Sequence, residues 1–316
     1  MNNGKQKVCI GIDVSKDTLD IFYESKSYKI SNTKNAIVSF IETHIKDTSN
    51  TLCVMENTGG YERLAEETFI KHSIPVHIGH ANAIHAFAQA CNHFAKTDKL
   101  DAILIHNYAV FISGRGENGN LEIDEEHREI IALRRLARSS EEALQAAQCQ
   151  IKQMPAACTK FLKKRIKYLQ AEIASISKEI NEKINNHGTL KAKRDLLTSM
   201  TGVGEKTATI LLAELPELGT LSRGEVAKLV GVAPQTHQSG KKSAAGHIAG
   251  GRFYARKSLY MVALVGLRHD PFIKKKYQNF VARGKAKKVA IVALMRDIII
   301  ILNSMLKRGE EYKIFA

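Results

Sequence analysis

The segment Val8–Val14 reads VCIGIDV, and together with two later apolar segments it decides the fold of the first part of the chain. Its short run of β-branched and apolar residues is typical of a strand. Leu19–Glu24 and Tyr28–Ile30 are predicted to complete an antiparallel meander, and Leu52–Glu56 (LCVME) is predicted as a further strand. Four helices are expected, at Thr33–Lys46, Gly59–Lys71, Ala83–Cys91 and Asp98–Phe111. A brief strand, Val76–Ile78, is expected between the second and the third of them. Antiparallel strands followed by β–α alternation predict a mixed α/β domain.

The remainder of the chain is predicted to be mostly helical. Residues 113–126 are polar and glycine-bearing, as in a linker. A heptad-like apolar seam follows, made of Ile166, Leu169, Ile173, Ile176 and Ile180, with Ile184 one step further on. The seam predicts an antiparallel helical hairpin or a dimerising coiled coil, and an ordinary amphipathic helix packed on its own core is an equal alternative. We divide the chain into an α/β domain (1–114), a helical linker (115–190) and a mostly α-helical domain (191–316).

The charge of the chain is unevenly distributed. Its formal net charge is +15 over 316 residues. Residues 1–112 hold 11 Lys and Arg against 12 Asp and Glu, whereas residues 113–316 hold 36 against 20. A basic second part indicates a polyanionic partner such as a nucleic acid, although a solvated basic surface would look the same.

The cysteines and the apolar segments favour a cytoplasmic protein. The chain has five cysteines without any CxxC pair, which argues against a disulfide framework and a zinc site. No signal peptide is expected, because no apolar stretch follows the first residues. The longest apolar run, Val289–Leu302, is interrupted by Arg296 and Asp297, so no membrane span and no membrane partner are expected.

Four acidic residues occupy positions where catalytic sites commonly form. Asp13 and Glu56 each end a predicted strand, and Asp98 and Asp101 begin a predicted helix three residues apart, on one face. Clustered carboxylates repel one another unless a hard cation neutralises them, and oxygen ligands select Mg²⁺ or Mn²⁺. Each acid alone is uninformative, since an Asp-x-x-Asp pair on a helix is usually a solvated face.

The ordered motifs GIDVSK, MENTGGY and KTDKLDA resemble the RuvC-like DEDD domain of a bacterial insertion-sequence transposase family, which also contains Piv-type DNA invertases and bridge-RNA-guided recombinases. The resemblance implies an RNase H-like fold with a Mg²⁺ site formed by Asp13, Glu56, Asp98 and Asp101. Two positions depart from the family pattern: Asn57 follows the Glu, and His80-Ala81 stands where Asn-Pro is common.

The second half of the chain carries two further motifs. Leu196–Leu212 (LLTSMTGVGEKTATILL) has the glycine spacing of a helix-hairpin-helix, which would present backbone N–H groups and Lys206 to a phosphate; a structural αα-turn is the alternative. Leu229–Gly251 is a long loop rich in glycine, serine and lysine. Its GVAPxxxxSG form resembles the family's C-terminal domain, and the resemblance implies that Ser239 is the nucleophile, well ahead of Ser243.

Basic clusters in this half are expected to contact phosphates. The residues predicted to bind nucleic acid are Lys206, Lys241, Lys242, Arg252, Arg256, Lys257, Lys285, Lys287 and Lys288. The resemblance implies a transposase that cuts and rejoins DNA, acting on element ends and target duplexes, guided by a noncoding RNA and assembled as a dimer or tetramer. Three alternatives stay open: a Piv-like invertase, a junction endonuclease that uses the carboxylates alone, and a helix-hairpin-helix protein that only binds nucleic acid.

Overall fold

The chain forms two compact units, residues 1–122 and 123–316. The structure is a computed structural model that describes residues 7–91, 98–116, 124–235, 238–239, 242–243 and 246–313. The predicted helical linker and the predicted C-terminal domain pack together within the second unit. The division of the chain into three domains, with boundaries at residues 114 and 190, therefore stays a prediction.

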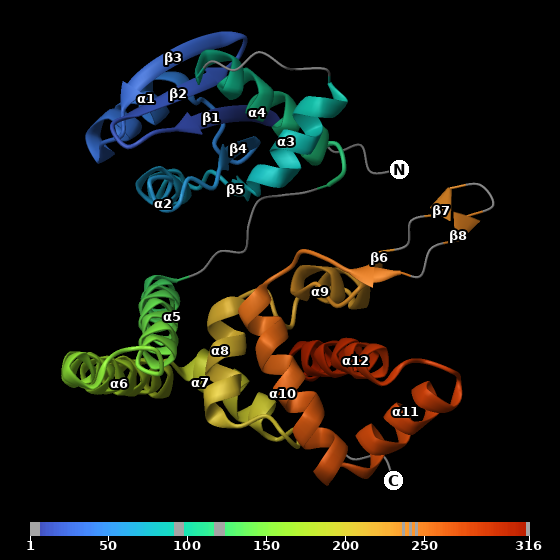
Figure 1. Cartoon of the computed structure of the whole chain (residues 1–316). Coiled ribbons are helices and arrows are strands. Elements are labelled where there is room, and N and C mark those ends of the chain that lie inside the picture. Colours follow the sequence, from blue (N-terminus) through green and yellow to red (C-terminus); the bar gives the residue numbers. More distant parts are fainter. Residues whose placement is uncertain are drawn as a thin grey trace. The chain divides into compact units, whose positions relative to one another are not determined.

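The first unit is built on a five-stranded mixed sheet in the order β3-β2-β1-β4-β5 (Figure 1). β1, β2 and β3 form an antiparallel meander, and β4 and β5 continue the sheet in parallel with β1. The strands span Val8–Val14, Thr18–Tyr23, Lys26–Ser31, Thr51–Glu56 and Val76–Gly79. This arrangement fits the RNase H-like domain that the sequence motifs imply.

Helices cover both faces of this sheet. On one face α1 (Lys34–His44) and α2 (Arg63–Lys71) bury a core that includes Phe40 and Phe69. On the other face α3 (Ala81–Ala90) and α4 (Asp98–Ser113) bury a smaller core around Val54. Alternate residues of β1 and β4 point to the two cores, as the period of two in a strand requires.

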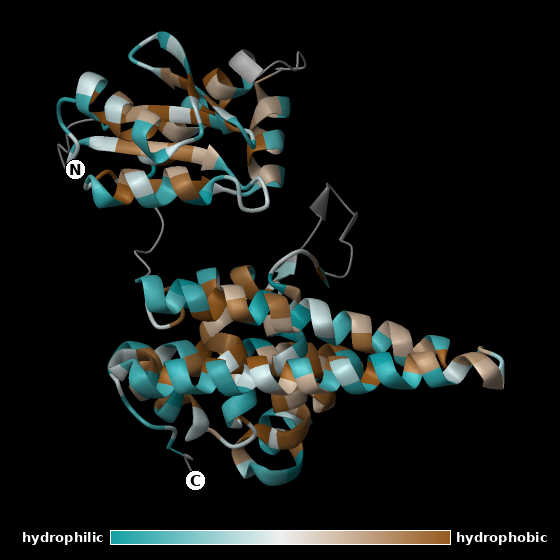
Figure 2. Cartoon of the chain, turned by 90° about the vertical axis from the view of Figure 1, so that its left-hand side faces the viewer, coloured by the Kyte–Doolittle hydropathy of each residue, from teal (hydrophilic) through white to brown (hydrophobic). Residues whose placement is uncertain are grey.

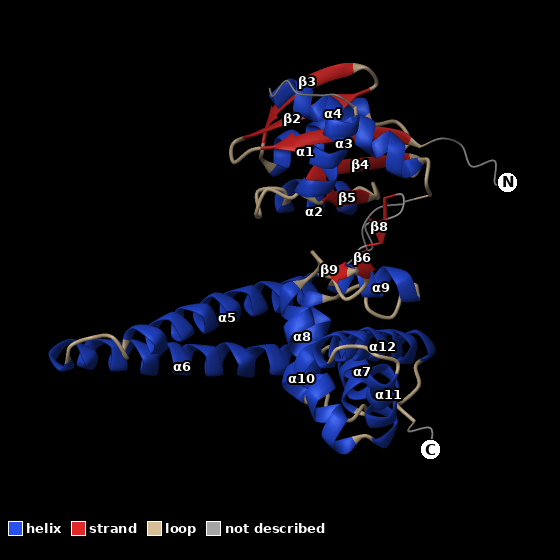
Figure 3. Cartoon of the chain, turned by 45° about the vertical axis from the view of Figure 1, so that its right-hand side comes forward, coloured by secondary structure: helices blue, strands red, loops and turns tan. Residues whose placement is uncertain are grey.

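The second unit begins with a long helical hairpin. α5 (Glu125–Gln150) and α6 (Ala156–Asn186) lie side by side, and their connected ends extend away from the remaining helices (Figure 3). Every residue of the predicted seam is buried or half-buried, and Ile176, Ile180 and Ile184 pack with Ile130 and Ala137 of α5. The seam therefore packs on the chain's own preceding helix, which corresponds to the helical hairpin among the alternatives that the sequence leaves open.

In the described part of the second unit, six further helices form the main core: α7 (Gly188–Thr198), α8 (Glu205–Glu214), α9 (Arg223–Val230), α10 (Phe253–His269), α11 (Pro271–Ala282) and α12 (Lys287–Arg308). Figure 2 shows hydrophobic residues gathered where these helices meet. Among the described residues, α12 alone is long and apolar enough to cross a membrane. Its residues Leu294, Ile298 and Leu302 are fully buried in this core, as expected for the central helix of a globular domain.

Two predicted segments differ from the structure. α2 begins at Arg63 and not at Gly59, because Gly59 and Gly60 adopt left-handed backbone angles (φ 82° and 128°) in a loop before the helix. The predicted loop Leu229–Gly251 contains short antiparallel pairs. β6 (Pro234–Gln235) pairs with β9 (His247–Ile248), and β7 (Gln238–Ser239) pairs with β8 (Lys242–Ser243).

Candidate active site

Asp13 and Glu56 end two neighbouring parallel strands. β1 and β4 pair with Ile12 opposite Met55, so the next residue of each strand, Asp13 and Glu56, lies beside the other at the carboxyl edge of the sheet (Figure 1). Loops at this edge commonly carry the site in α/β proteins. The strand register therefore brings together two acids that are 43 positions apart in the sequence.

Both acids face the side of the sheet that α4 covers. Ile12 and Val14 of β1, and Met55 of β4, belong to the core beneath α1 and α2. Since side chains alternate along a strand, Asp13 and Glu56 point to the opposite face.

Gly11 brings α4 into direct contact with β1. A Cβ atom at Gly11 would lie 2.3 Å from the backbone nitrogen of His106 and 2.4 Å from the carbonyl oxygen of Ala102. At the other end of the contact, the thiol of Cys9 lies next to Ser113, the last residue of α4. α4 thus runs antiparallel to β1, and its first turn lies toward the strand end that carries Asp13.

That first turn contains the two remaining acids of the predicted tetrad. Asp101 is half-buried, and the side chain of Asp98 lies outside the described residues. Within the described part of the chain, no three His, Cys, Asp or Glu side chains are close enough to form a metal site by themselves. The donors are nonetheless carboxylate oxygens, the type that Mg²⁺ and Mn²⁺ prefer, so their chemistry fits a hard divalent cation.

The loop after Glu56 is held by the buried carboxylate of Glu62. One oxygen of Glu62 accepts hydrogen bonds from the backbone N–H groups of Thr58 (3.2 Å) and Gly60 (2.8 Å) and from the Thr58 hydroxyl (2.8 Å). Burial alone would raise the pKa of Glu62, but these hydrogen bonds hold it below its ordinary value. Asn57, one of the departures from the family pattern, accepts a hydrogen bond from the N–H of Gly59 (3.1 Å) and so tightens the same loop.

Asn32 joins the loops that follow the two strand-end acids. Its Nδ2 donates to the carbonyl oxygens of Ser15 and Tyr61, each at 3.1 Å. Asp20 is a further acid beside the site: it is the cross-strand partner of Asp13 and is paired with Lys29 at 3.0 Å. Neither residue is predicted from the sequence, because these contacts depend on strand pairing and on loops far apart in the chain.

His80, the other departure from the family pattern, caps α3. Its Nδ1 accepts a hydrogen bond from the N–H of Asn82 at 3.1 Å, the role that an Asn, Ser or Asp often has at a helix start. The substitution therefore keeps the capping function, and the helix begins two residues earlier than predicted.

Ser239 belongs to the second unit. It lies in β7, where it pairs with Lys242 of β8 in an antiparallel ladder. β6 and β9 form a second pair beside α9 (Figure 3). Ser243 is the partner of Gln238 in the same ladder. The side chains of Ser239, Lys242 and Ser243, and all of Lys241 and His237, lie outside the described residues.

Comparison with known proteins shows the family to which the chain belongs. Residues 10–161 match an IS110-type DEDD transposase profile, and residues 194–278 match the profile of the IS116/IS110/IS902 transposase family. The chain belongs to the IS110-type transposase family. Over 97% of this chain and 98% of theirs, it is 27% identical to the pilin gene-inverting proteins of Moraxella lacunata and Moraxella bovis. It is 33% identical to an uncharacterized 43.6 kDa protein of the insertion element IS110 from Streptomyces coelicolor, over 37% of this chain and 30% of that protein. It is accordingly a DNA recombinase of the transposase type.

In this transposase the segment predicted as a helix-hairpin-helix consists of α7, a turn and α8. Gly202 (φ 93°) lies against α10, where a Cβ atom would be 3.0 Å from the carbonyl oxygen of Val262. Gly204 caps α8, and Lys206 in its first turn is exposed and 3.8 Å from Glu141. The turn thus combines close helix packing with an exposed cation, and phosphate binding there stays a prediction.

Six of the predicted basic residues of the transposase fall into two groups. The guanidinium of Arg252 bonds both oxygens of Glu217 at 2.6 Å, and that of Arg256 donates to carbonyl oxygens of Val230, Gly231 and Gly250. These two arginines therefore stabilise the second unit itself. Lys257, Lys285, Lys287 and Lys288 are exposed to solvent and are the stronger candidates for phosphate contact.

Proposed function

We propose that this transposase cuts and rejoins DNA strands with its strand-end carboxylates and Ser239. The observation that supports the proposal is the register of β1 and β4, in which Asp13 and Glu56 are neighbours at the strand ends toward which the first turn of α4 lies. Such a set of acids has no use in a protein that only binds the phosphate backbone, because the acids would repel it.

The carboxylates of Asp13, Glu56, Asp98 and Asp101 would hold Mg²⁺, or Mn²⁺ in its place. When bound, the cation supplies positive charge that stabilises the extra negative charge on phosphate oxygens during phosphoryl transfer. Asp13 and Glu56 lie at one edge of the sheet, and a cation bound there would be kept at a fixed position.

Ser239 is proposed as the nucleophile of the strand exchange. Its Oγ forms a bond to phosphorus while the bond from phosphorus to a sugar oxygen breaks, and the leaving sugar hydroxyl gains a proton in place of the one that serine loses. The phosphoserine ester conserves the energy of the broken bond, so a sugar hydroxyl of another strand can reverse the reaction. Hydrolysis by water alone would not conserve it.

Substitution of the acids tests the carboxylate part of the proposal. Asp13→Ala and Asp101→Ala should each abolish recombination of a plasmid substrate while the melting temperature stays near that of the wild type, and EDTA should have the same effect. Glu42→Gln is the matched control, because Glu42 is exposed on α1, which covers the opposite face of the sheet. Full recombination by either alanine variant, or in EDTA, rules the carboxylate site out.

Trapping the covalent intermediate tests the serine. Ser239→Ala should lose cleavage and joining yet still bind DNA, whereas Ser243→Ala should keep most activity. Denaturation of a reaction on labelled DNA, followed by peptide mass spectrometry, should locate the adduct at Ser239. An adduct on another residue would assign the nucleophile to that residue. Cleavage by Ser239→Ala without any adduct would support a junction endonuclease that uses the carboxylates alone.

Site-specific inversion is the second candidate function. It is favoured by the likeness to the pilin gene-inverting proteins along nearly the whole of both chains. A plasmid that carries two inverted copies of the element junction distinguishes the two functions. Inversion of the intervening DNA without insertion elsewhere supports an invertase, and insertion into a separate target plasmid supports a transposase.

We also propose that a noncoding RNA from the element guides the transposase and that it acts as a dimer or tetramer. Purification from cells that carry the native element, followed by sequencing of the bound nucleic acid, tests the first point. Sedimentation analysis of the same preparation tests the second. Recovery of only random cellular RNA, or a monomer at all concentrations, contradicts the respective point.

A further inference from the structure

The free end of the α5–α6 hairpin has an unusual charge distribution. Between Glu142 and Glu172 the chain contains no acidic residue, although it contains six basic ones: Lys152, Lys160, Lys163, Lys164, Arg165 and Lys167. All six are exposed, and none of them forms an ion pair with any described residue. We call this segment, residues 151–168, the basic hairpin end.

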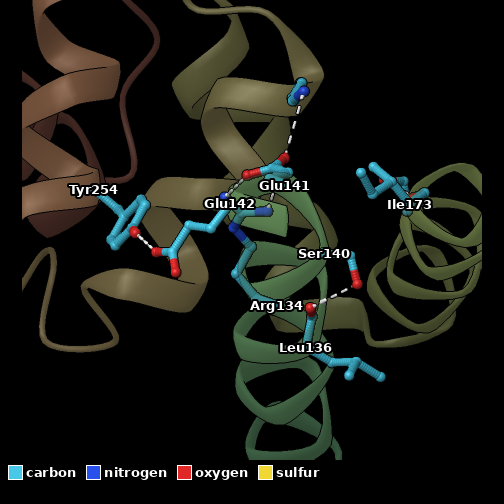
Figure 4. Close-up of polar contacts among 9 residues, drawn as sticks. Arg134, Leu136, Ser140, Glu141, Glu142, Ile173 and Tyr254 are labelled. Atoms are coloured by element: carbon cyan, nitrogen blue, oxygen red, sulfur yellow. Dashed lines mark hydrogen bonds and ion pairs between the residues drawn. The ribbon is translucent and has the colours of Figure 1, made fainter. Parts of the chain in front are cut away.

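The acids that border the basic hairpin end are already engaged elsewhere. Glu141 bonds Arg134 (2.9 Å) and lies near Lys206, and Glu142 accepts a hydrogen bond from Tyr254 (Figure 4). Glu172 accepts a hydrogen bond from Ser140 at 2.7 Å. These contacts hold α5 against its neighbours near the main body, and they leave the positive charge of the hairpin end without internal compensation.

Two aromatic side chains are exposed among these cations. Phe161 and Tyr168 are each 66% exposed. They are seven residues apart on α6, so they lie on one face about 10 Å apart along the helix axis. Lys164 lies between them on that face at helical spacing, and the ammonium of Lys160 is 5.1 Å from the centre of the Phe161 ring. The buried seam residues of α6, such as Ile176 and Ile180, lie on the face toward α5.

We infer that the basic hairpin end binds an unpaired nucleic-acid strand, with Phe161 and Tyr168 stacking on bases and the surrounding cations contacting phosphates. Exposed aromatic rings between cations suit unstacked bases, whereas a duplex hides the faces of its bases and needs only the cations. The residues of this surface do not include the strand-end acids or Ser239. The inference therefore does not depend on the proposed catalytic residues.

Binding measurements with the full-length protein test the inference. The probes are a labelled oligouridine, the matching oligothymidine and a DNA duplex of equal length. Phe161→Ala/Tyr168→Ala should weaken binding of the unpaired strands by about tenfold or more, and should leave duplex binding within about twofold. The ratio of RNA to DNA affinity reports which unpaired strand the surface prefers.

Removal of the cations has a different expected signature. In Lys163→Gln/Lys164→Gln/Lys167→Gln, the slope of log K against log salt for an unpaired strand should become shallower by about 2. Lys178→Gln is the matched control, because Lys178 lies on the same helix but is 3.8 Å from Glu182. Bromouridine photocrosslinking should label peptides that contain Phe161 or Tyr168.

Several outcomes overturn the inference. One is no binding of unpaired strands by the wild type, and another is equal binding by the wild type and the aromatic double variant. A third is crosslinking confined to other segments. The inference is also wrong if strand binding by the double variant is unchanged and another interaction is lost. Loss of self-association in sedimentation would assign the surface to contact with a second copy. Loss of binding to vesicles that contain phosphatidylserine would assign it to a membrane.

Discussion

Glu62 shows how one buried carboxylate can hold a loop of the candidate site in place. Its side chain is 7% exposed and accepts three hydrogen bonds from the segment that follows Glu56. Because its pKa is lowered in the folded state, the ionised form is favoured by folding. The contribution of Glu62 to stability is complete above its pKa in the unfolded chain, near 4.5. It is lost as the pH falls through the lower pKa of the folded state.

Glu62→Gln should therefore destabilise the protein by about 1–3 kcal/mol at neutral pH, because an amide replaces the strong carboxylate acceptor. The difference from the wild type should shrink as the pH falls below about 4.5, where the wild-type carboxyl group also becomes protonated. Urea denaturation at several pH values measures both effects. Glu42→Gln, at an exposed position of α1, serves as the control and should change stability by less than about 0.5 kcal/mol. An equal loss at all pH values contradicts the argument.

Single residues also show what the sequence could and could not predict about the site. The position of Asp13 and Glu56 at strand ends follows from a pattern that is local in the sequence, because each ends a run of apolar residues, and their catalytic role stays a prediction. Asp20 and Asn32 were missed, since the first acts through its strand register and the second through loops that meet only in the folded chain. Local patterns do not encode either kind of contact.

At the scale of elements, the contact between β1 and α4 depends on the absence of a side chain at Gly11. Gly11→Ala would place a methyl group within 2.4 Å of α4 backbone atoms, which cannot move without moving the helix. The variant should lose about 1–3 kcal/mol or more of stability and also recombination activity, because α4 carries Asp101. Denaturation and a plasmid recombination assay measure the two losses.

Gly224→Ala is the control for this prediction. Gly224 lies in the first turn of α9, and no atom is within 4 Å of the position that its Cβ would take. Alanine should be neutral or stabilise that helix by up to about 1 kcal/mol. If both glycine substitutions behave alike, close packing at Gly11 is not the cause.

The α5–α6 hairpin offers a second test at this scale. Ile180 is 2% exposed and packs in the seam with Ile130 and Ala137. Ile180→Ala should cost about 2–5 kcal/mol, because it removes buried surface and leaves a cavity. Tyr168→Ala, on the exposed face of the same helix, should cost less than about 0.5 kcal/mol. Equal melting temperatures for the two variants would contradict the packing of the seam.

The ends of elements were harder to predict than their existence. The apolar periods located the strands Val8–Val14 and Thr51–Glu56 and the helices beside them, because periodicity reports which face is buried. The start of α2 was misplaced by four residues, since Gly59, Gly60 and the Glu62 carboxylate build a loop where the composition also suits a helix. The short ladders around Ser239 lack an apolar alternation, and so the sequence favoured a loop.

At the scale of the whole molecule, the two parts of the chain differ in net charge, and we expect them to have different functions. Residues 1–112 are nearly neutral and contain the acids, whereas residues 113–316 carry a net charge of +16. A nucleic acid is expected to bind mainly through the second part. For about six phosphate contacts, the slope of log K against log salt should be roughly −5, and binding that does not depend on salt would contradict this division of tasks.

The two ends of α12 allow this electrostatic argument to be tested within one helix. Lys287 and Lys288 occupy its first turn, where the helix dipole disfavours cations, whereas Lys307 and Arg308 occupy its last turn, where the dipole favours them. All four side chains are exposed. The 22-residue helix is about 33 Å long, so its ends are separated by more than the roughly 10 Å over which charges interact at 0.1 M salt. Cations in the first turn of a helix interact unfavourably with the helix dipole. We therefore expect them where an anionic ligand, such as a phosphate, offsets this unfavourable interaction.

Lys287→Gln/Lys288→Gln should therefore weaken duplex DNA binding and make the salt slope shallower by about 1.8, because two phosphate contacts are lost. The same variant should keep its stability or gain up to about 1 kcal/mol, since an unfavourable interaction with the dipole is removed. Lys307→Gln/Arg308→Gln removes the same charge from the other end, and it should leave the salt slope unchanged and slightly lower stability. Fluorescence anisotropy across a salt series and thermal denaturation distinguish the two pairs. Equal loss of DNA affinity in both variants would mean that only total charge matters, and that the start of α12 is not a specific contact for DNA.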